Sequence, residues 1–183
     1  PTAGEAAKKL TTLYLMITAA ALGGYLLGGM GPFDAVNHAF SVVATGGFST
    51  KDESIAAFAT PFIEWWTILI MIMVGLNFTL LGQLLRGRLG VLRDLETKTY
   101  LGLKITCSVL TALVLAVSLT VWQDTAGTEH TGFFAALRHG TFATVAMQTG
   151  TGFCLSDYSA WPYLTVALIF GLAAIGGCGG STA

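Results

Sequence analysis

Four long apolar stretches without a charged side chain constrain the fold of this chain more than any other feature. They cover residues 10–33, 65–85, 105–123 and 158–183. Each is comparable in length to the roughly 20 apolar residues that a transmembrane helix needs. Hydrophobic residues form 54% of the 183 and charged residues only 10%, and the mean hydropathy of +0.70 lies outside the range of ordinary soluble domains. The sequence therefore predicts an all-α integral membrane protein.

The positive charges are segregated along the chain and predict its orientation. Lys8 and Lys9 precede the first apolar run, and a second group, residues 86–104, follows the second run and contains Arg86, Arg88, Arg93, Lys98 and Lys104. Only Lys51 and Arg138 lie elsewhere. Because cytoplasmic loops carry an excess of Lys and Arg, we expect the N-terminal end and the 86–104 loop to be cytoplasmic in a multi-pass protein of the cell membrane.

The opposite side carries an acidic bias. Its carboxylates would either raise the local concentration of cations near a pore mouth or simply solvate the loops, and the sequence leaves both open. They are Asp34, Asp52, Glu53, Asp124, Glu129 and Asp157.

Two glycine-containing segments lie between the apolar runs: TGGFST at residues 45–50 and TGTGFC at residues 149–154. Glycine adopts positive φ, so successive carbonyls can face one axis and replace the water around a monovalent cation. Irregular backbone at membrane depth is tolerated where it lines a cavity or is buried in protein. The expected ion-binding residues are Thr45, Gly46, Gly47 and Phe48, with Thr149, Gly150, Thr151, Gly152 and Phe153.

Side chains within the two segments have alternative roles. The threonine hydroxyls could contact the ion or bond back to the preceding helix end. Phe48 and Phe153 are expected to wedge the segments against surrounding helices rather than touch the ion. Since neither segment contains a carboxylate, a site for potassium or sodium is favoured over one for calcium.

The order of elements repeats once along the chain. Residues 10–30 predict a spanning helix, 34–44 a short re-entrant helix capped by Asp34, and 61–85 a second spanning helix. The series recurs as 100–122, 133–147 and a final span opened by Trp161 and Pro162. We predict two units, residues 1–99 and 100–183. Each has the plan span, re-entrant pore helix, filter loop, span of a potassium-channel-like pore, with the negative end of the short helix facing the filter.

Several residues outside these segments also carry expectations. The glycine pairs at 23–24 and 28–29 predict close helix packing, and Asn77 is expected to bond between helices. His38, His130 and His139 are expected at surfaces or helix ends. The tryptophans are expected in an interfacial belt; they are Trp65, Trp66, Trp122 and Trp161. The three cysteines have neither disulfide-framework nor zinc spacing.

Three groups of short motifs occur along the chain. The first is NHAFS at residues 37–41, followed by ATGGFST at 44–50. The second is LRH at 137–139, TGF at 151–153, DYS at 157–159 and WP at 161–162, and the third is IGGCGGST at 175–182. They resemble, in this order, the second pore repeat, the third pore repeat and the intramembrane gate loop of the TrkH-type potassium uptake proteins, which belong to the Trk, Ktr and HKT superfamily. The gate residues would be Gly176, Gly177, Cys178, Gly179, Gly180 and Ser181.

The resemblance implies a pseudo-tetrameric pore in which four repeats of one polypeptide each give one filter segment. K+ would be the transported ion, with no covalently bound cofactor. The first and fourth repeats would come from a longer parent chain, two polypeptides would form a homodimer, and a cytosolic nucleotide-binding ring similar to TrkA or KtrA would regulate it. Gly150, Cys154 and Leu155 depart from the usual family pattern, which leaves the strength of ion discrimination open.

Other functions are less well supported by the residues. A sodium-preferring transporter of the same superfamily and a non-transporting membrane scaffold remain alternatives. A membrane enzyme would need a Ser/Lys, paired Asp or His/Glu arrangement within the spans, and none is visible in the sequence. We therefore expect no enzyme, and no nucleic-acid partner.

Overall fold

The computed structural model describes residues 3–58, 60–84, 87, 90, 94–118, 121–179 and 181–182. In chain order the elements are α1 (Ala3–Leu27), α2 (Pro32–Val43), the 3-10 turn η1 (Ser54–Phe58), α3 (Pro61–Val74), α4 (Phe78–Leu84), α5 (Leu95–Ser118), β1 (Trp122–Gln123), β2 (Glu129–His130), α6 (Phe133–Gln148), the 3-10 turn η3 (Tyr158–Ala160) and α7 (Tyr163–Ile175).

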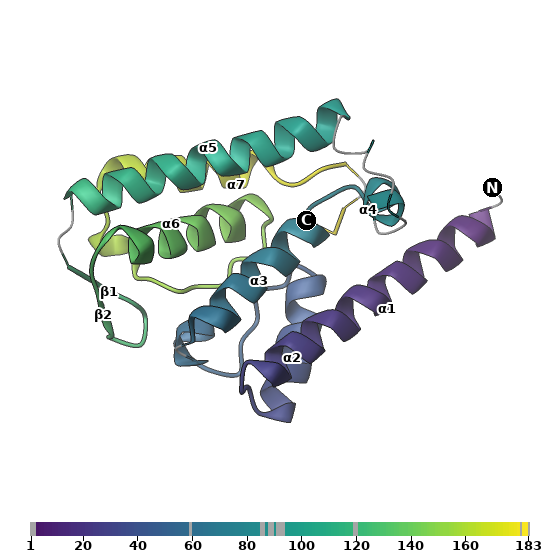
Figure 1. Ribbon diagram of the computed structural model, residues 1–183, viewed down its shortest axis with the longest axis horizontal. Helices are drawn as coiled ribbons and strands as arrows, with labels where there is room; N and C mark the ends of the chain where they lie inside the picture. The colour runs from purple at the N-terminus through teal and green to yellow at the C-terminus, as the bar shows by residue number, and fades with distance from the viewer. Residues whose placement is uncertain are drawn as a thin grey trace.

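Helix α6 lies at the centre of the packing. It contacts α5 and α7 on one side and α3 on another, while α1 packs against α2 and α3 (Figure 1). The hairpin of β1 and β2 lies between α5 and α6 in the sequence and pairs Trp122 with His130. The helices α2 and α6, which precede the two glycine segments, are therefore each packed against two or more other helices.

The structure confirms an all-α membrane fold but changes three of the expected spans, the last of which is described below. Among the described residues, two single helices are long and apolar enough to cross a membrane: α1, from Ala7 to Leu27, and α5. The expected continuous helix over 61–85 is wrong, because α3 and α4 meet at a bend of 115°. The expected helix over 100–122 is also too long, since Trp122 lies in β1.

The last apolar run does not form a complete span. α7 has 13 residues and ends at Ile175, short of the roughly 20 residues that a bilayer needs. Gly176 follows with φ of 74°, a left-handed conformation that a glycine adopts readily and that ends the helix. Residues 176–179 and 181–182 then continue as an irregular segment, which we call the C-terminal loop.

The starts of the helices follow proline and capping rules, with one difference from expectation. Thr60 caps α3: its Oγ1 accepts a hydrogen bond from the Ile63 N–H at 3.4 Å, and Pro61 follows at the first helical position. In α2 the N-cap is Gly31 rather than Asp34. Asp34 lies in the first turn, and its Oδ1 accepts from the Thr50 hydroxyl at 2.5 Å.

The glycine pairs of α1 do pack closely, through one member of each pair. A Cβ at Gly24 would overlap the indole of Trp66 on α3, and one at Gly28 would lie 2.5 Å from Ile63 Cγ1. A Cβ at Gly23 or Gly29 would meet no described atom within 4 Å. The approach is fixed by Trp66 Nε1, which donates to the Ala21 carbonyl at 3.3 Å.

Several charged and aromatic residues lie where the sequence did not place them. Trp122 and Trp161 are buried in a core cluster with α6, so they are not interfacial anchors as expected. Lys104 belongs to α5, is 3% exposed, and lies with Nζ 4.5 Å from the ring centroid of Tyr100. It is therefore not a solvated loop charge.

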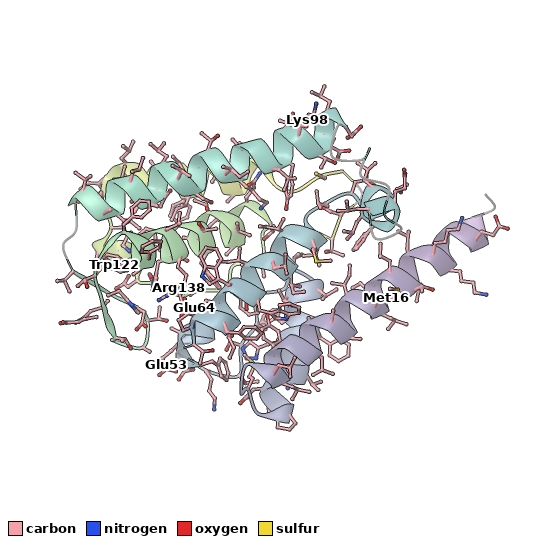
Figure 2. The ribbon with its side chains drawn as sticks, in the orientation of Figure 1. Met16, Glu53, Glu64, Lys98, Trp122 and Arg138 are labelled. Atoms are coloured by element: carbon pink, nitrogen blue, oxygen red, sulfur yellow. The ribbon has the colours of Figure 1, made fainter. Side chains whose placement is uncertain are left out.

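The other described basic residues are divided between the two ends of the molecule, since Lys51 lies in the loop that holds Glu53 and Arg138 pairs with Glu64. Lys98 lies at the end that also holds the N-terminus, and Glu53 and Trp122 lie at the opposite end (Figure 2). Lys8, Lys9 and Lys98 are exposed. Arg86, Arg88 and Arg93 lie outside the described residues.

Candidate functional site

The two glycine segments leave the carboxyl ends of α2 and α6 in the same way. The Thr45 N–H donates to the Val42 carbonyl at 3.2 Å, and the Gly150 N–H donates to the Met147 carbonyl at 3.1 Å. In each case the N–H of the second residue after the helix closes a tight turn onto a carbonyl of the last helical turn. The negative end of each helix dipole is therefore directed at a glycine segment, which favours a cation there without a fixed charge.

The segments themselves are in contact at Gly47. Its φ is 66°, and a Cβ built on it would overlap the Thr151 carbonyl oxygen and lie 3.2 Å from the Gly152 carbonyl carbon. Any side chain at position 47 would thus push the two backbones apart. Gly150 and Gly152 also have positive φ, of 66° and 73°, so repeated left-handed residues turn this backbone where the two halves of the chain meet.

The threonine hydroxyls are occupied by protein acceptors. Thr149 Oγ1 donates to the Val145 carbonyl at 2.8 Å and lies 2.9 Å from Thr151 Oγ1. Thr45, a non-glycine residue with φ of 50°, directs its Oγ1 to the Thr182 carbonyl at 2.7 Å. Of the two roles left open, hydrogen bonding within the protein is the one these contacts support.

The two phenylalanines differ in environment. Phe153 is fully buried, with its ring stacked on His38 of α2 at a centroid distance of 5.8 Å and an angle of 24°. Phe48 is 80% exposed, so within this chain it does not wedge its segment against a helix as expected.

The histidines of α2 and α6 are core residues, contrary to the expected surface or helix-end positions. His38 is fully buried and its Nε2 lies 2.9 Å from Ser49 Oγ. His139 is 1% exposed and its Nδ1 lies 2.6 Å from Ser156 Oγ. Each ring thus links a short helix to a serine that follows a Gly-Phe pair.

This pairing was missed because the spacing differs between the two halves. His38 and Ser49 are 11 residues apart, whereas His139 and Ser156 are 17 apart. A search at constant spacing rejects the match. The two histidine–serine pairs share only the order of their residues along the chain: a histidine in the short helix, then Gly-Phe, then a serine. That order is the sequence signal that predicts both pairs.

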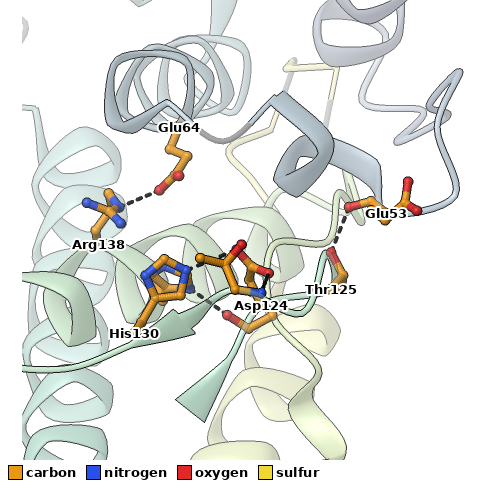
Figure 3. A network of polar contacts seen from close by, with 9 residues as sticks. Glu53, Glu64, Asp124, Thr125, His130 and Arg138 are labelled. Carbon is orange, nitrogen blue, oxygen red and sulfur yellow. Dashed lines mark hydrogen bonds and ion pairs between the residues drawn. The ribbon is translucent and has the colours of Figure 1, made fainter. Parts of the chain in front are cut away.

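A polar network joins the two halves at the end of the molecule that holds Glu53 (Figure 3). Arg138 of α6 forms an ion pair with the buried Glu64 of α3. His130 Nε2 lies 3.0 Å from Asp124 Oδ2, which ties β2 to β1. The Thr125 hydroxyl donates to the Glu53 carbonyl at 2.7 Å, so the hairpin also contacts the loop before η1.

Carboxylates in the loops are stabilised in their charged form. Burial by itself would raise the pKa of Asp124, but hydrogen bonds from His130 and the Thr128 N–H outweigh it, so the pKa lies below the usual range. Hydrogen bonds from Ser159 likewise lower the pKa of the exposed Asp157. Asp124 is 7% exposed, so it contributes to the hairpin rather than to an open acidic surface.

The C-terminal loop lies against the bend between α3 and α4. The Cys178 N–H donates to the Gly75 carbonyl at 3.0 Å, and the Thr182 N–H donates to the Val74 carbonyl at 3.3 Å. On the other side the Gly179 N–H donates to Glu96 Oε1 at 2.8 Å. Of the six expected gate residues, Gly180 lies outside the described residues.

Asn77 lies in this bend, not within a continuous span. Its Oδ1 accepts from the Thr79 N–H at 2.9 Å and so caps the start of α4. The expected bond between helices is therefore replaced by a local cap. A cavity of about 580 Å³ borders the C-terminal loop on the α5 side, with Glu96, Tyr100 and Gln148 among its lining residues.

Comparison with known proteins identifies relatives over the whole chain. A family described as TrkH, cation transport protein, matches residues 10–183. The Trk system potassium uptake protein TrkI of Halomonas elongata is 38% identical over all of this chain and 35% of its own length. The Trk system potassium uptake protein TrkH of Escherichia coli K12 is 34% identical over all of this chain and 36% of its own length.

A solved structure agrees with the fold. The crystal structure of the potassium transporter TrkH from Vibrio parahaemolyticus matches with a TM-score of 0.87 and 30% identity, over all of this chain and 38% of that one. The chain thus spans about a third of the length of these relatives. By sequence and by fold, it belongs to the TrkH family of cation transport proteins.

Proposed function

We propose that this chain forms part of the pore of a potassium uptake system in the cell membrane. Its relatives are named potassium uptake proteins, and the observation that carries the proposal is the contact between Gly47 and Thr151. Two backbone segments with positive φ meet there, each at the negative end of a short helix. Carbonyl oxygens in such a setting replace the hydration shell of a monovalent cation.

The selectivity filter in this proposal consists of backbone rather than side chains. The hydroxyls of Thr45 and Thr149 bond within the protein, so the carbonyls of the two segments are the ion ligands. Uptake is driven by the membrane potential, worth about 2.3 kcal/mol per charge for each 100 mV. The C-terminal loop is the gate beneath the filter. No catalytic reaction is assigned to the chain.

Further repeats of the same polypeptide complete the pore. Phe153 of the second half packs on His38 of the first half, whereas Phe48, at the matching position, is 80% exposed. We assign to a preceding repeat the surface that covers Phe48. In the full-length protein, a cysteine at position 48 should then react with a maleimide more slowly than one at the exposed Lys51. Equal rates would contradict this assignment.

The orientation and the partners follow from the same proposal. The end that holds the N-terminus and Lys98 is cytoplasmic, in keeping with its exposed basic residues. The units 1–99 and 100–183 are two successive pore repeats. Two copies of the full-length polypeptide form a homodimer, and a cytosolic nucleotide-binding ring similar to TrkA or KtrA acts from the cytoplasmic end.

Rubidium flux into liposomes that contain the full-length protein tests the proposed function. Gly152→Ala places a side chain at φ of 73° where a Cβ meets no described atom within 4 Å, so it would project into the proposed pore. Gly127→Ala is the matched control, because Gly127 has φ of 80° and equally open space but lies in the hairpin turn. Flux should fall in the first variant only.

Two outcomes contradict this function. Equal flux in both variants would mean that residue 152 does not line the ion path, and an absence of flux in the unaltered protein would refute transport. The same liposomes compare rubidium with sodium, and a preference for sodium would replace potassium as the substrate.

A further inference from the structure

The bend between α3 and α4 leaves backbone groups that need partners. Where a helix ends, its last carbonyls lack the donors of the next turn. α3 ends at Val74, and α4 leaves at 115° from Phe78. In lipid, an unsatisfied carbonyl costs several kcal/mol, so a break within a span persists only where other parts of the protein supply donors.

The C-terminal loop supplies those donors. The Cys178 N–H bonds the Gly75 carbonyl at 3.0 Å, and both the N–H and the hydroxyl of Thr182 lie 3.3 Å from the Val74 carbonyl. The exchange is mutual, because the loop's own N–H groups are satisfied by the same contacts. Two segments separated by about a hundred residues thus complete each other.

The loop also connects the bend to the first glycine segment. The Thr182 carbonyl accepts from the Thr45 hydroxyl at 2.7 Å. Gly75 lies close to the second segment, since a Cβ there would lie 2.9 Å from Thr149 Cγ2 and would overlap the Tyr100 hydroxyl. The bend is therefore packed against the second glycine segment and connected to the first through the loop, and it leaves no room for a side chain at position 75.

We propose that the bend between α3 and α4 is the seat of the gate: Gly75 and Asn77 are positioning residues that hold the C-terminal loop in the closed position. This inference rests on the proposed function. Opening breaks the bonds from Cys178 and Thr182 to the bend. The loop then moves toward the cavity of about 580 Å³ on the α5 side, where Glu96 already bonds the Gly179 N–H at 2.8 Å.

The geometry also indicates how a movement of α4 would be transmitted to the gate. α4 is attached to the bend through the cap that Asn77 forms with the Thr79 N–H. A tilt of α4 displaces the Val74 and Gly75 carbonyls from the loop. A force applied to α4 at the proposed cytoplasmic end therefore releases the loop from its seat, and the bond from the Thr45 hydroxyl to the Thr182 carbonyl breaks with it.

A reversible cross-link between the seat and the loop tests this inference in the full-length protein. The Cys178 N–H bonds the Gly75 carbonyl at 3.0 Å, two residues before Asn77, so Asn77→Cys places a second thiol on the bend that the native one occupies. Under oxidation we expect a 77–178 disulfide, identified by mass spectrometry of the digested protein. Rubidium flux should be lost when the disulfide forms and return on reduction, because the loop is then fixed in its seat.

Two controls separate the cross-link from its side effects. Asn77→Ser keeps a side chain that can cap α4 and forms no disulfide, so its flux should not respond to oxidation. The double variant Asn77→Cys with Cys178→Ser loses the cap but retains no thiol in the loop, so any loss of flux that it shows under oxidation comes from another cysteine.

Each remaining outcome overturns one proposal or the other. A disulfide that does not form shows that the loop does not occupy the seat. A disulfide that forms while flux continues shows that the seated loop is not a closed gate, and overturns the inference even if Gly152→Ala blocks transport. Protein that carries no flux in any variant refutes the proposed function instead, while the cross-link yield still reports whether the loop occupies the seat.

Discussion

Glu64 and Arg138 form an ion pair that joins α3 of the first half of the chain to α6 of the second (Figure 3). Glu64 is 4% exposed, so its charge needs a close cation, and Arg138 supplies it. The pair lies beside the hairpin, where His130 and Asp124 also act on Glu64 electrostatically. It therefore fixes α6, whose carboxyl end leads into the second glycine segment, against α3 of the first half.

Loss of one partner of this pair should be more damaging than loss of both. Glu64→Gln or Arg138→Met leaves a buried charge without its partner, and we expect a loss of about 3–5 kcal/mol in the free energy of unfolding. The double variant Glu64→Gln with Arg138→Met should lose less than the sum of the two single losses. Thermal unfolding in detergent, analysed as a double-mutant cycle, measures the coupling. Additive losses would show that the pair does not form.

The bond between His139 and Ser156 should stabilise the second glycine segment. Ser156→Ala removes the partner of a buried ring nitrogen and should cost about 1–3 kcal/mol. Ser159→Ala, at an exposed position in η3, should stay within about 0.5 kcal/mol. Denaturation midpoints compare the two, and the ratio of rubidium to sodium flux reports whether the segment has loosened. Equal effects from both serines would contradict the role of His139.

The approach of α1 to α3 gives a matched pair of neighbouring glycines. Gly24→Ala should cost about 1–3 kcal/mol, because the indole of Trp66 must move and its bond to the Ala21 carbonyl is disturbed. Gly23→Ala meets no described atom within 4 Å and should be neutral or stabilise the helix by up to about 1 kcal/mol. The melting temperatures of the two variants measure this difference in stability. An equal loss in both would show that α1 does not approach α3 through Gly24.

The hairpin should weaken in acid. Because the pKa of Asp124 is lower in the folded protein than in the unfolded chain, its ionised form stabilises folding above the unfolded pKa of about 3.9. This contribution is lost as the pH falls through the folded pKa. The melting temperature should therefore drop below about pH 4, and less steeply in Asp124→Asn. An identical acid profile in the variant would exclude Asp124 as the cause.

The local elements could be predicted from the sequence because they depend on local chemistry. Pro32 and Pro61 open helices in which their missing N–H groups cost nothing. Thr45, Gly47 and Gly152 have positive φ directly after two short helices, where the glycine content predicted irregular backbone. Local sequence failed to predict the position of Lys104. Its charge indicated a loop, whereas its side chain is buried on α5.

The contacts between distant segments were decided by the tertiary structure alone. No pattern in the sequence indicates that Cys178 and Thr182 bond the carbonyls of a broken α3, or that Asn77 caps α4. Hydropathy cannot detect such a break, because a bent span is as apolar as a straight one. Likewise His38 and His139 reach their serines at different spacings. Composition and local spacing determine where the backbone leaves helical geometry. Only the packing of distant segments determines which groups form hydrogen bonds with the backbone N–H and carbonyl groups exposed there.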